Sequence, residues 1–135
     1  MPSLDNMMLR QIIMDHYENP RNHELVEDDS YKKVNMDSET CIDNIDIQAK
    51  IENGVIEDIR FDGEACAICT SSTSIMTELL IGKTIDEARV IIENYMNMIF
   101  EKDYDPEILE EAIAFYNTHK QANRIKCATL GWKGI

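Results

Sequence analysis

The chain has 135 residues, with 26 acidic and 13 basic residues that give a formal net charge of −13. This length suits one hydrophobic core, so we expect residues 1–135 to form a single domain. The acidic balance argues against nucleic acid and anionic membranes as partners, because both attract basic proteins.

Location is predicted from hydrophobic runs and cysteine usage. No segment approaches the roughly 20 apolar residues of a membrane span, and the N-terminal stretch lacks the pattern of a secretion signal. We therefore expect a cytoplasmic protein without a membrane partner. In that compartment, the four cysteines are expected to be thiols or metal ligands rather than disulfides.

The first predicted element is an amphipathic helix over residues 4–17, which ends before Asn19-Pro20 because the residue before proline avoids the helical region. Its expected apolar stripe consists of Leu4, Met8, Ile12 and Tyr17, with Leu9 and Ile13 beside it. A polar loop is expected next. His16 and His23 flank the break. Either could be a ligand or a base, but the favoured expectation is that both face solvent or cap an element.

Residues 31–61 predict three antiparallel strands. Tyr31–Met36 gives a weak first strand, and residues 45–51 alternate strictly between apolar and polar, which indicates a sheet with one buried face. Asn53-Gly54 is a hairpin signal, and the return strand covers residues 55–61.

Helices are expected in the remainder of the chain. The predicted spans are 71–81 with Ser71 or Ser72 as cap, 85–99 behind a Thr84–Glu87 capping box, 106–118 after Asp105-Pro106, and 123–132. The fold class is therefore α+β: an N-terminal helix, a three-stranded antiparallel sheet, and several helices packed on one face.

Cys41 and Asp43 stand two positions apart at the start of a predicted strand, so both side chains leave the same face. A thiolate and a carboxylate side by side repel unless a cation lies between them, and zinc accepts both. The alternative is a buried cysteine beside a surface aspartate.

Cys66 and Cys69 form a C-x-x-C pair where a predicted strand passes into a predicted helix. A thioredoxin-like redox pair needs a βαβ unit, whereas a meander precedes this motif. We therefore favour one of the two as a metal ligand and the other as its neighbour. Cys127, the fourth cysteine, lies near two cations, Arg124 and Lys126, which favour a thiolate. The alternative is a half-buried cysteine on a terminal helix.

Together these motifs resemble those of the U-type iron–sulfur cluster assembly proteins, the NifU N-terminal-like IscU/SufU family. The resemblance implies the SufE/NifU-like fold. The similar stretches are MDHYENPRN (14–22), C-x-D (41–43), DGEACAICTSSTSIM (62–76) and RIKCATLGW (124–132). Two features favour the SufU branch. Cys66 and Cys127 are 61 positions apart, which leaves room for an extra helical segment, and Lys126 stands where the scaffold branch tends to have histidine.

The resemblance implies a zinc ion held by Cys41, Asp43, Cys66 and Cys127, with Arg124 as an auxiliary basic residue. It also implies a cysteine desulfurase as partner and downstream cluster-assembly or apo iron–sulfur proteins as recipients. Ile42 and Ala65 replace glycines that are usual in the family, and Cys69 stands where serine is more usual.

The implied function is zinc-dependent sulfur transfer in iron–sulfur cluster assembly, with Cys41 accepting persulfide sulfur from the desulfurase. Whether the chain is an enzyme in its own right is left open at this point. One alternative is a scaffold on which the same residues hold iron or a [2Fe–2S] cluster. Another is a structural zinc domain that acts as an adaptor.

Overall fold

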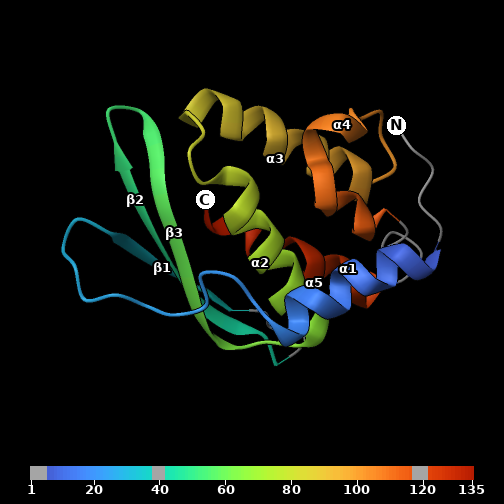
Figure 1. Ribbon diagram of the computed structural model, residues 1–135, viewed down its shortest axis with the longest axis horizontal. Helices are drawn as coiled ribbons and strands as arrows, with labels where there is room; N and C mark the ends of the chain where they lie inside the picture. Colours follow the sequence, from blue (N-terminus) through green and yellow to red (C-terminus); the bar gives the residue numbers. More distant parts are fainter. Residues whose placement is uncertain (1–5, 38–41, 117–121) are drawn as a thin grey trace.

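A computed structural model describes residues 6–37, 42–116 and 122–135 (Figure 1). In chain order the elements are α1 (Asn6–Glu18), β1 (Lys32–Asp37), β2 (Asn44–Glu52), β3 (Val55–Glu64), α2 (Ala67–Leu80), α3 (Ile85–Ile99), α4 (Pro106–Leu109), the 3-10 helix η1 (Glu110–Phe115), α5 (Ala122–Thr129) and the 3-10 helix η3 (Trp132–Gly134). This order confirms the predicted α+β class. None of the described helices is both long and apolar enough to cross a membrane.

The sheet is an antiparallel meander with the strand order β1-β2-β3, as predicted. Asn53 and Gly54 form the β2–β3 turn with φ values of 53° and 74°. Two consecutive positive φ angles suit the tight turn that follows the twist of a hairpin. A register shift at Lys50/Ile51 then lets the return strand bury both Ile56 and Ile59.

The helices lie to one side of the sheet, and α2 runs next to β3 (Figure 1). The sheet turns Ile45, Ile47 and Phe61 into the core, as the alternation predicts. Gln48, which is one of the polar residues in the alternation of β2, is also buried. Its side-chain amide bonds the backbone N–H and carbonyl of Val26, each at 2.8 Å, so the loop before β1 covers part of the second face.

Helix α2 is the centre of the molecule, because eleven of its residues are buried and it contacts α1, α5, η1 and β3. Its buried hydroxyls bind neighbouring elements. Ser72 Oγ donates to the Ala128 carbonyl at 2.6 Å and accepts from Trp132 Nε1 at 3.0 Å. The Tyr95 hydroxyl donates to the same carbonyl at 2.8 Å, and its ring stacks on Trp132. These bonds attach the C-terminal segment to α2.

The predicted start of α2 was wrong. The helix begins at Ala67 with Cys66 as its N-cap, four residues before the expected Ser71. Ser71 is buried inside the helix, and its hydroxyl donates to the Ala67 carbonyl at 2.7 Å. Packing against its neighbours therefore outweighs the capping preference of the serines.

The later helices follow the predicted starts more closely than the predicted ends. Helix α3 has the full capping box between Thr84 and Glu87. Asp105 caps α4, but Glu110 has φ 46°, so the predicted helix breaks there into α4 and η1. The last part of that prediction, residues 117–118, lies outside the described residues, and α5 covers only part of the predicted span 123–132.

The buried face of α1 differs from the predicted stripe. Leu9 is buried and Ile12 and Ile13 are partly buried, whereas Met8 and Tyr17 are exposed. His16 is 0% exposed, so the expectation that it faces solvent or caps the helix was wrong. Leu4 lies outside the described residues. The true face follows the spacing 9, 12, 13 and 16, which is one side of a helix.

Gly63 lies in β3 opposite Ile45 of β2, and its φ of +131° favours glycine. A Cβ there would collide with the Asn44 carbonyl oxygen and lie 2.9 Å from Ile45 Cα. We expect Gly63→Ala to lower the free energy of unfolding by about 3 kcal/mol, measured by urea unfolding. Gly54→Ala is the matched control, since its φ is +74° but no atom lies within 4 Å of the added Cβ. An equal loss in both variants would show that the contact with Asn44 has no effect.

Candidate metal centre

Three of the predicted site residues meet at one end of the molecule. Asp43 directly precedes β2, Cys66 connects β3 to α2, and Cys127 lies in α5. One ligand atom from each lies within 4.8 Å of the others. Residues separated by up to 84 positions in sequence therefore form one cluster of two thiols and a carboxylate.

Asp43 is fully buried, and its carboxylate is oriented by the backbone of the α2 entry. Its Oδ1 accepts the Cys66 N–H at 2.8 Å, and its Oδ2 lies 3.7 Å from Cys66 Sγ. A buried carboxylate needs hydrogen bonds or a cation to offset its lost hydration. One oxygen is thus held by the backbone while the other faces the cysteine.

Cys66 is the N-cap of α2 and is partly exposed. Its Sγ accepts the Cys69 N–H at 3.4 Å. The N-cap position places the sulfur beside the free N–H groups of the first turn of α2. The sulfur is therefore suited to bind a cation and remains reachable from solvent.

Cys127 is 8% exposed and approaches the cluster from α5. The carbonyl of the next residue, Ala128, receives the hydrogen bonds from Ser72 and Tyr95. Burial raises the pKa of Tyr95, so its phenol stays protonated and donates. Because Ser72 lies on the helix that Cys66 begins, the two thiols are placed relative to each other through α2.

The cluster fits a tetrahedral zinc ion. Zinc–sulfur bonds of about 2.3 Å and zinc–oxygen bonds of about 2.1 Å place the two ligand atoms about 3.6 Å apart at a tetrahedral angle. The Asp43 Oδ2 to Cys66 Sγ distance is 3.7 Å. The donor set, two thiols and one carboxylate, also belongs to the ligands that zinc binds most often.

The other predicted site residues are placed only in part. Cys41 lies outside the described residues, and of Arg124 the structure describes the backbone, in the first turn of α5. Cys69 is fully buried in the first turn of α2, and none of the three described cysteines forms a disulfide. The described sheet is an antiparallel meander, so the βαβ setting that a thioredoxin-like pair requires is not found there.

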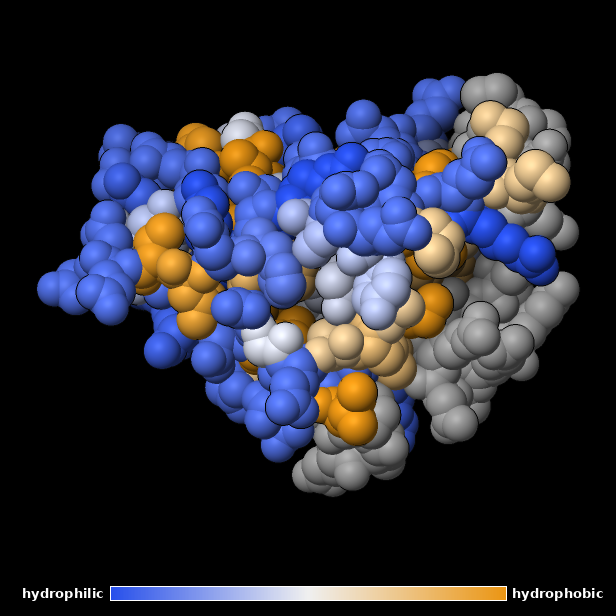
Figure 2. Space-filling model, turned by 60° about the horizontal axis from the view of Figure 1, so that its bottom comes forward, coloured by the Kyte–Doolittle hydropathy of each residue, from blue (hydrophilic) through white to orange (hydrophobic). Residues whose placement is uncertain are grey.

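The surface near the cluster has an apolar component. Ile42, between the two predicted ligands Cys41 and Asp43, is 68% exposed. Figure 2 brings this end of the molecule forward and shows hydrophobic side chains among mainly hydrophilic ones.

A second cluster of metal-ligating side chains was not predicted as a group, although His16 alone was a candidate ligand. His16, Glu78 and Glu111 each offer a ligand atom, and these atoms also lie within 4.8 Å of one another. The helical spacing of His16 from Leu9, Ile12 and Ile13 was a sequence signal for its burial. No local signal connects it to the two glutamates, which lie on α2 and η1.

The fold and the Asp–Cys–Cys cluster define a small α+β protein with a thiol-rich cluster of side chains that could hold a metal ion, and comparisons with known proteins assign the family. Residues 8–128 match the model of the NifU-like N-terminal domain family. The chain belongs to this family.

Individual relatives agree with this assignment. The chain is 40% identical to the zinc-dependent sulfurtransferase SufU of Bacillus subtilis, over 95% of this chain and 86% of that protein. It is 32% identical to the iron–sulfur cluster assembly scaffold protein IscU of Streptococcus pyogenes, over 96% and 81%. A crystal structure from Fervidobacterium islandicum, of an iron–sulfur cluster assembly scaffold protein for the SUF system, superposes with a TM-score of 0.84 and 30% identity, over 97% and 96% of the chains.

Proposed function

We propose that this protein acts in iron–sulfur cluster assembly as a zinc-dependent sulfur acceptor for a cysteine desulfurase. The observation that carries the proposal is the meeting of Asp43, Cys66 and Cys127 within 4.8 Å. Cys41, two residues before Asp43, is the proposed fourth ligand. The likeness to a relative named as a zinc-dependent sulfurtransferase supports the choice of zinc and of reaction.

Zinc bound at this centre would keep its cysteine ligands deprotonated. Three thiolates and one carboxylate around Zn²⁺ carry a formal charge of about −2. The centre also joins the segment before β2, the start of α2, and α5. Part of the free energy of zinc binding is therefore expected to appear as folding stability.

The proposed transfer step is a thiol–disulfide-type exchange. The Cys41 thiolate attacks the terminal sulfur of the persulfide on the desulfurase. A new sulfur–sulfur bond forms on Cys41, the persulfide bond breaks, and the desulfurase cysteine leaves as a thiolate, so no external oxidant or reductant is needed. Arg124, three positions before Cys127 on α5, is proposed to steady the negative charge.

The expected partners are a cysteine desulfurase and, downstream, cluster-assembly or apo iron–sulfur proteins. The exposed Ile42 beside the centre provides an apolar contact for the desulfurase. The proposed setting is the cytoplasm, where thiols remain reduced.

Cys41→Ala tests the proposed acceptor. We expect the variant to lose both the stimulation of desulfurase turnover and the loading of radiolabelled sulfur from cysteine, because no other proposed ligand takes the attacking role. Cys69→Ala is the matched control, since Cys69 is fully buried and is expected to keep both activities. Undiminished stimulation and sulfur loading in Cys41→Ala would exclude Cys41 as acceptor.

The alternative function is a scaffold that assembles a [2Fe–2S] cluster on the same residues. Its specific support is the likeness to relatives named as IscU scaffold proteins. Metal analysis of anaerobically purified protein separates the two. One tightly bound zinc without sulfide-to-iron absorption favours sulfur transfer, whereas a visible cluster favours the scaffold.

A further inference from the structure

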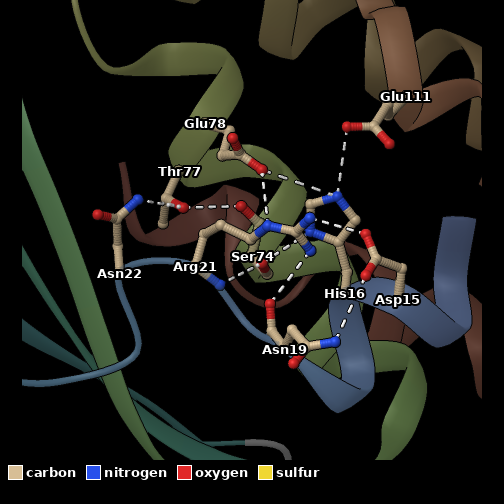
Figure 3. A network of polar contacts seen from close by, with 9 residues as sticks. All are labelled: Asp15, His16, Asn19, Arg21, Asn22, Ser74, Thr77, Glu78 and Glu111. Carbon is tan, nitrogen blue, oxygen red and sulfur yellow. Dashed lines mark hydrogen bonds and ion pairs between the residues drawn. The ribbon is translucent and has the colours of Figure 1, made fainter.

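The second cluster of metal-ligating groups lies where α1, α2 and η1 meet. His16 points its Nε2 between two carboxylates, at 3.8 Å from Glu78 Oε1 and 3.4 Å from Glu111 Oε1 (Figure 3). The three residues come from three different elements, and none of them belongs to the cysteine centre.

The imidazole of His16 is held in place by its other nitrogen. His16 is 0% exposed, and its Nδ1 lies 2.8 Å from Ser74 Oγ. Ser74 Oγ also accepts the backbone N–H of Arg21 at 2.8 Å. A metal at this site requires the tautomer in which Nδ1–H donates to Ser74 Oγ, so that Nε2 keeps its lone pair toward Glu78 and Glu111. In the metal-free protein the other tautomer lets Nε2–H donate to Glu111 Oε1 at 3.4 Å, and a bound ion would replace that hydrogen bond. A hydrogen-bonded second nitrogen is the usual arrangement of a metal-binding histidine.

The distances match a coordination sphere. Metal–nitrogen and metal–oxygen bonds of about 2.1 Å place adjacent ligand atoms about 3.4 Å apart at a tetrahedral angle. The observed separations from His16 Nε2 are 3.4 and 3.8 Å. The glutamate side chains are about half exposed, at 47% and 51%, so they can adjust by tenths of an ångström and admit an ion from solvent. A cavity of about 170 Å³ lined by both glutamates opens beside them.

The local charge also favours a dication. Asp15, Glu78 and Glu111 contribute three negative charges, whereas Arg21 contributes one positive charge. Arg21 lies 2.7 Å from Asp15 and 3.2 Å from Glu78, and its hydrogen bond lowers the pKa of Asp15. With neutral His16 the group has a formal charge of −2, which one divalent ion would balance.

We propose that His16, Glu78 and Glu111 form a second metal site, for a first-row divalent transition ion bound through nitrogen and oxygen. Imidazole and carboxylate ligands prefer harder ions than thiolates do, so this site and the cysteine centre would select different metals. An ion there would join α1 to α2 and η1, and it would bind whether or not the cysteine centre is filled.

The test is a titration of zinc-loaded, tag-free protein with Co²⁺, followed by absorption. We expect one further equivalent of cobalt to bind with the d–d absorption of nitrogen and oxygen ligands. Thiolate-to-cobalt charge transfer is monitored separately, because it would report exchange at the cysteine centre instead. Glu111→Gln is expected to weaken the binding at least about tenfold, since changes in metal shells commonly have effects of 10–100-fold.

Two control variants give the experiment its specificity. Glu110→Gln removes a neighbouring carboxylate that lines the same cavity, and His23→Gln removes a histidine that pairs with Asp62 elsewhere. Both are expected to bind cobalt within about twofold of the unmodified protein, whereas Glu78→Gln behaves like Glu111→Gln. The proposal would be overturned if the only saturable cobalt binding were the one reported by the thiolate band, or if no saturable binding were seen. Equal cobalt binding in Glu111→Gln and the unmodified protein would also overturn it. These results leave the cysteine centre untouched, so the proposed sulfur transfer is judged separately.

Discussion

Asp43→Ala is expected to weaken zinc binding by more than about 100-fold, because outer-shell changes alone commonly reduce affinity 10–100-fold. The carboxylate is the proposed oxygen ligand, and its Oδ1 also accepts the Cys66 N–H at 2.8 Å. The substitution thus removes one ligand and releases the backbone that places another. Competition with a chromophoric chelator measures the affinity directly.

Two further variants show whether the weaker zinc binding of Asp43→Ala comes from the lost ligand. Asp43→Asn keeps an oxygen for the Cys66 N–H and loses the charge, so we expect an affinity between those of Asp43→Ala and the unmodified protein. Asp46→Ala removes a carboxylate from β2, outside the cluster, and is expected to leave zinc binding unchanged. Zinc affinity in Asp43→Ala within about threefold of the original would show that Asp43 is not a ligand.

Cys66→Ser is expected to abolish tight zinc binding while the fold is retained. Serine is among the best N-cap residues, and its Oγ can accept the Cys69 N–H as the sulfur does. The metal-free variant should therefore unfold within about 1 kcal/mol of the metal-free parent in urea. Zinc content and urea unfolding on the same preparation separate the loss of the metal from the loss of the fold.

Cys69→Ser is expected to have the opposite effects, with zinc retained and stability to urea lowered. Cys69 is fully buried, so the serine hydroxyl that replaces its thiol is expected to lower the free energy of unfolding by about 1–3 kcal/mol. Zinc should remain at about one per chain, because Cys69 is outside the proposed ligand set. Retention of zinc in Cys66→Ser, or its loss in Cys69→Ser with the fold intact, would mean that the wrong cysteine of the C-x-x-C pair has been assigned.

Elements with a strong local signal could be predicted from the sequence. The alternation through Ile45 and Ile47, the Asn53-Gly54 turn and the Thr84 capping box all have the expected structure. In each case the backbone conformation is decided by residues within a few positions of one another. The caps Thr84 and Asp105 therefore located the starts of α3 and α4, whereas Ser71 and Ser72 did not locate the start of α2.

Elements decided by tertiary packing could not be predicted in this way. Cysteine is not a favoured N-cap, and the run Thr70–Ser74 has low helix propensity, so the first turn of α2 left no local sign. The helix is stabilised instead by contacts with other elements, including the hydrogen bonds of Ser72 with Ala128 and Trp132 and of Ser74 with His16. The break at Glu110 and the burial of His16 likewise depend on contacts between distant elements.

The two metal-ligating clusters differ in how far the sequence reveals them. The residues Asp43, Cys66 and Cys127 lie in recognisable motifs, so their meeting could be anticipated before the fold was known. Glu78 and Glu111 are two among many glutamates, and only the packing of α2 and η1 against α1 places them beside His16.

X-ray absorption at the zinc edge of the purified protein shows whether one zinc ion is held by three cysteines and Asp43. We expect about three sulfur atoms at about 2.3 Å and one oxygen at about 2.0–2.2 Å. A shell of four sulfurs would put Cys69 in place of Asp43. A shell of nitrogen and oxygen alone would remove the cysteine centre, and with it the proposed sulfur transfer.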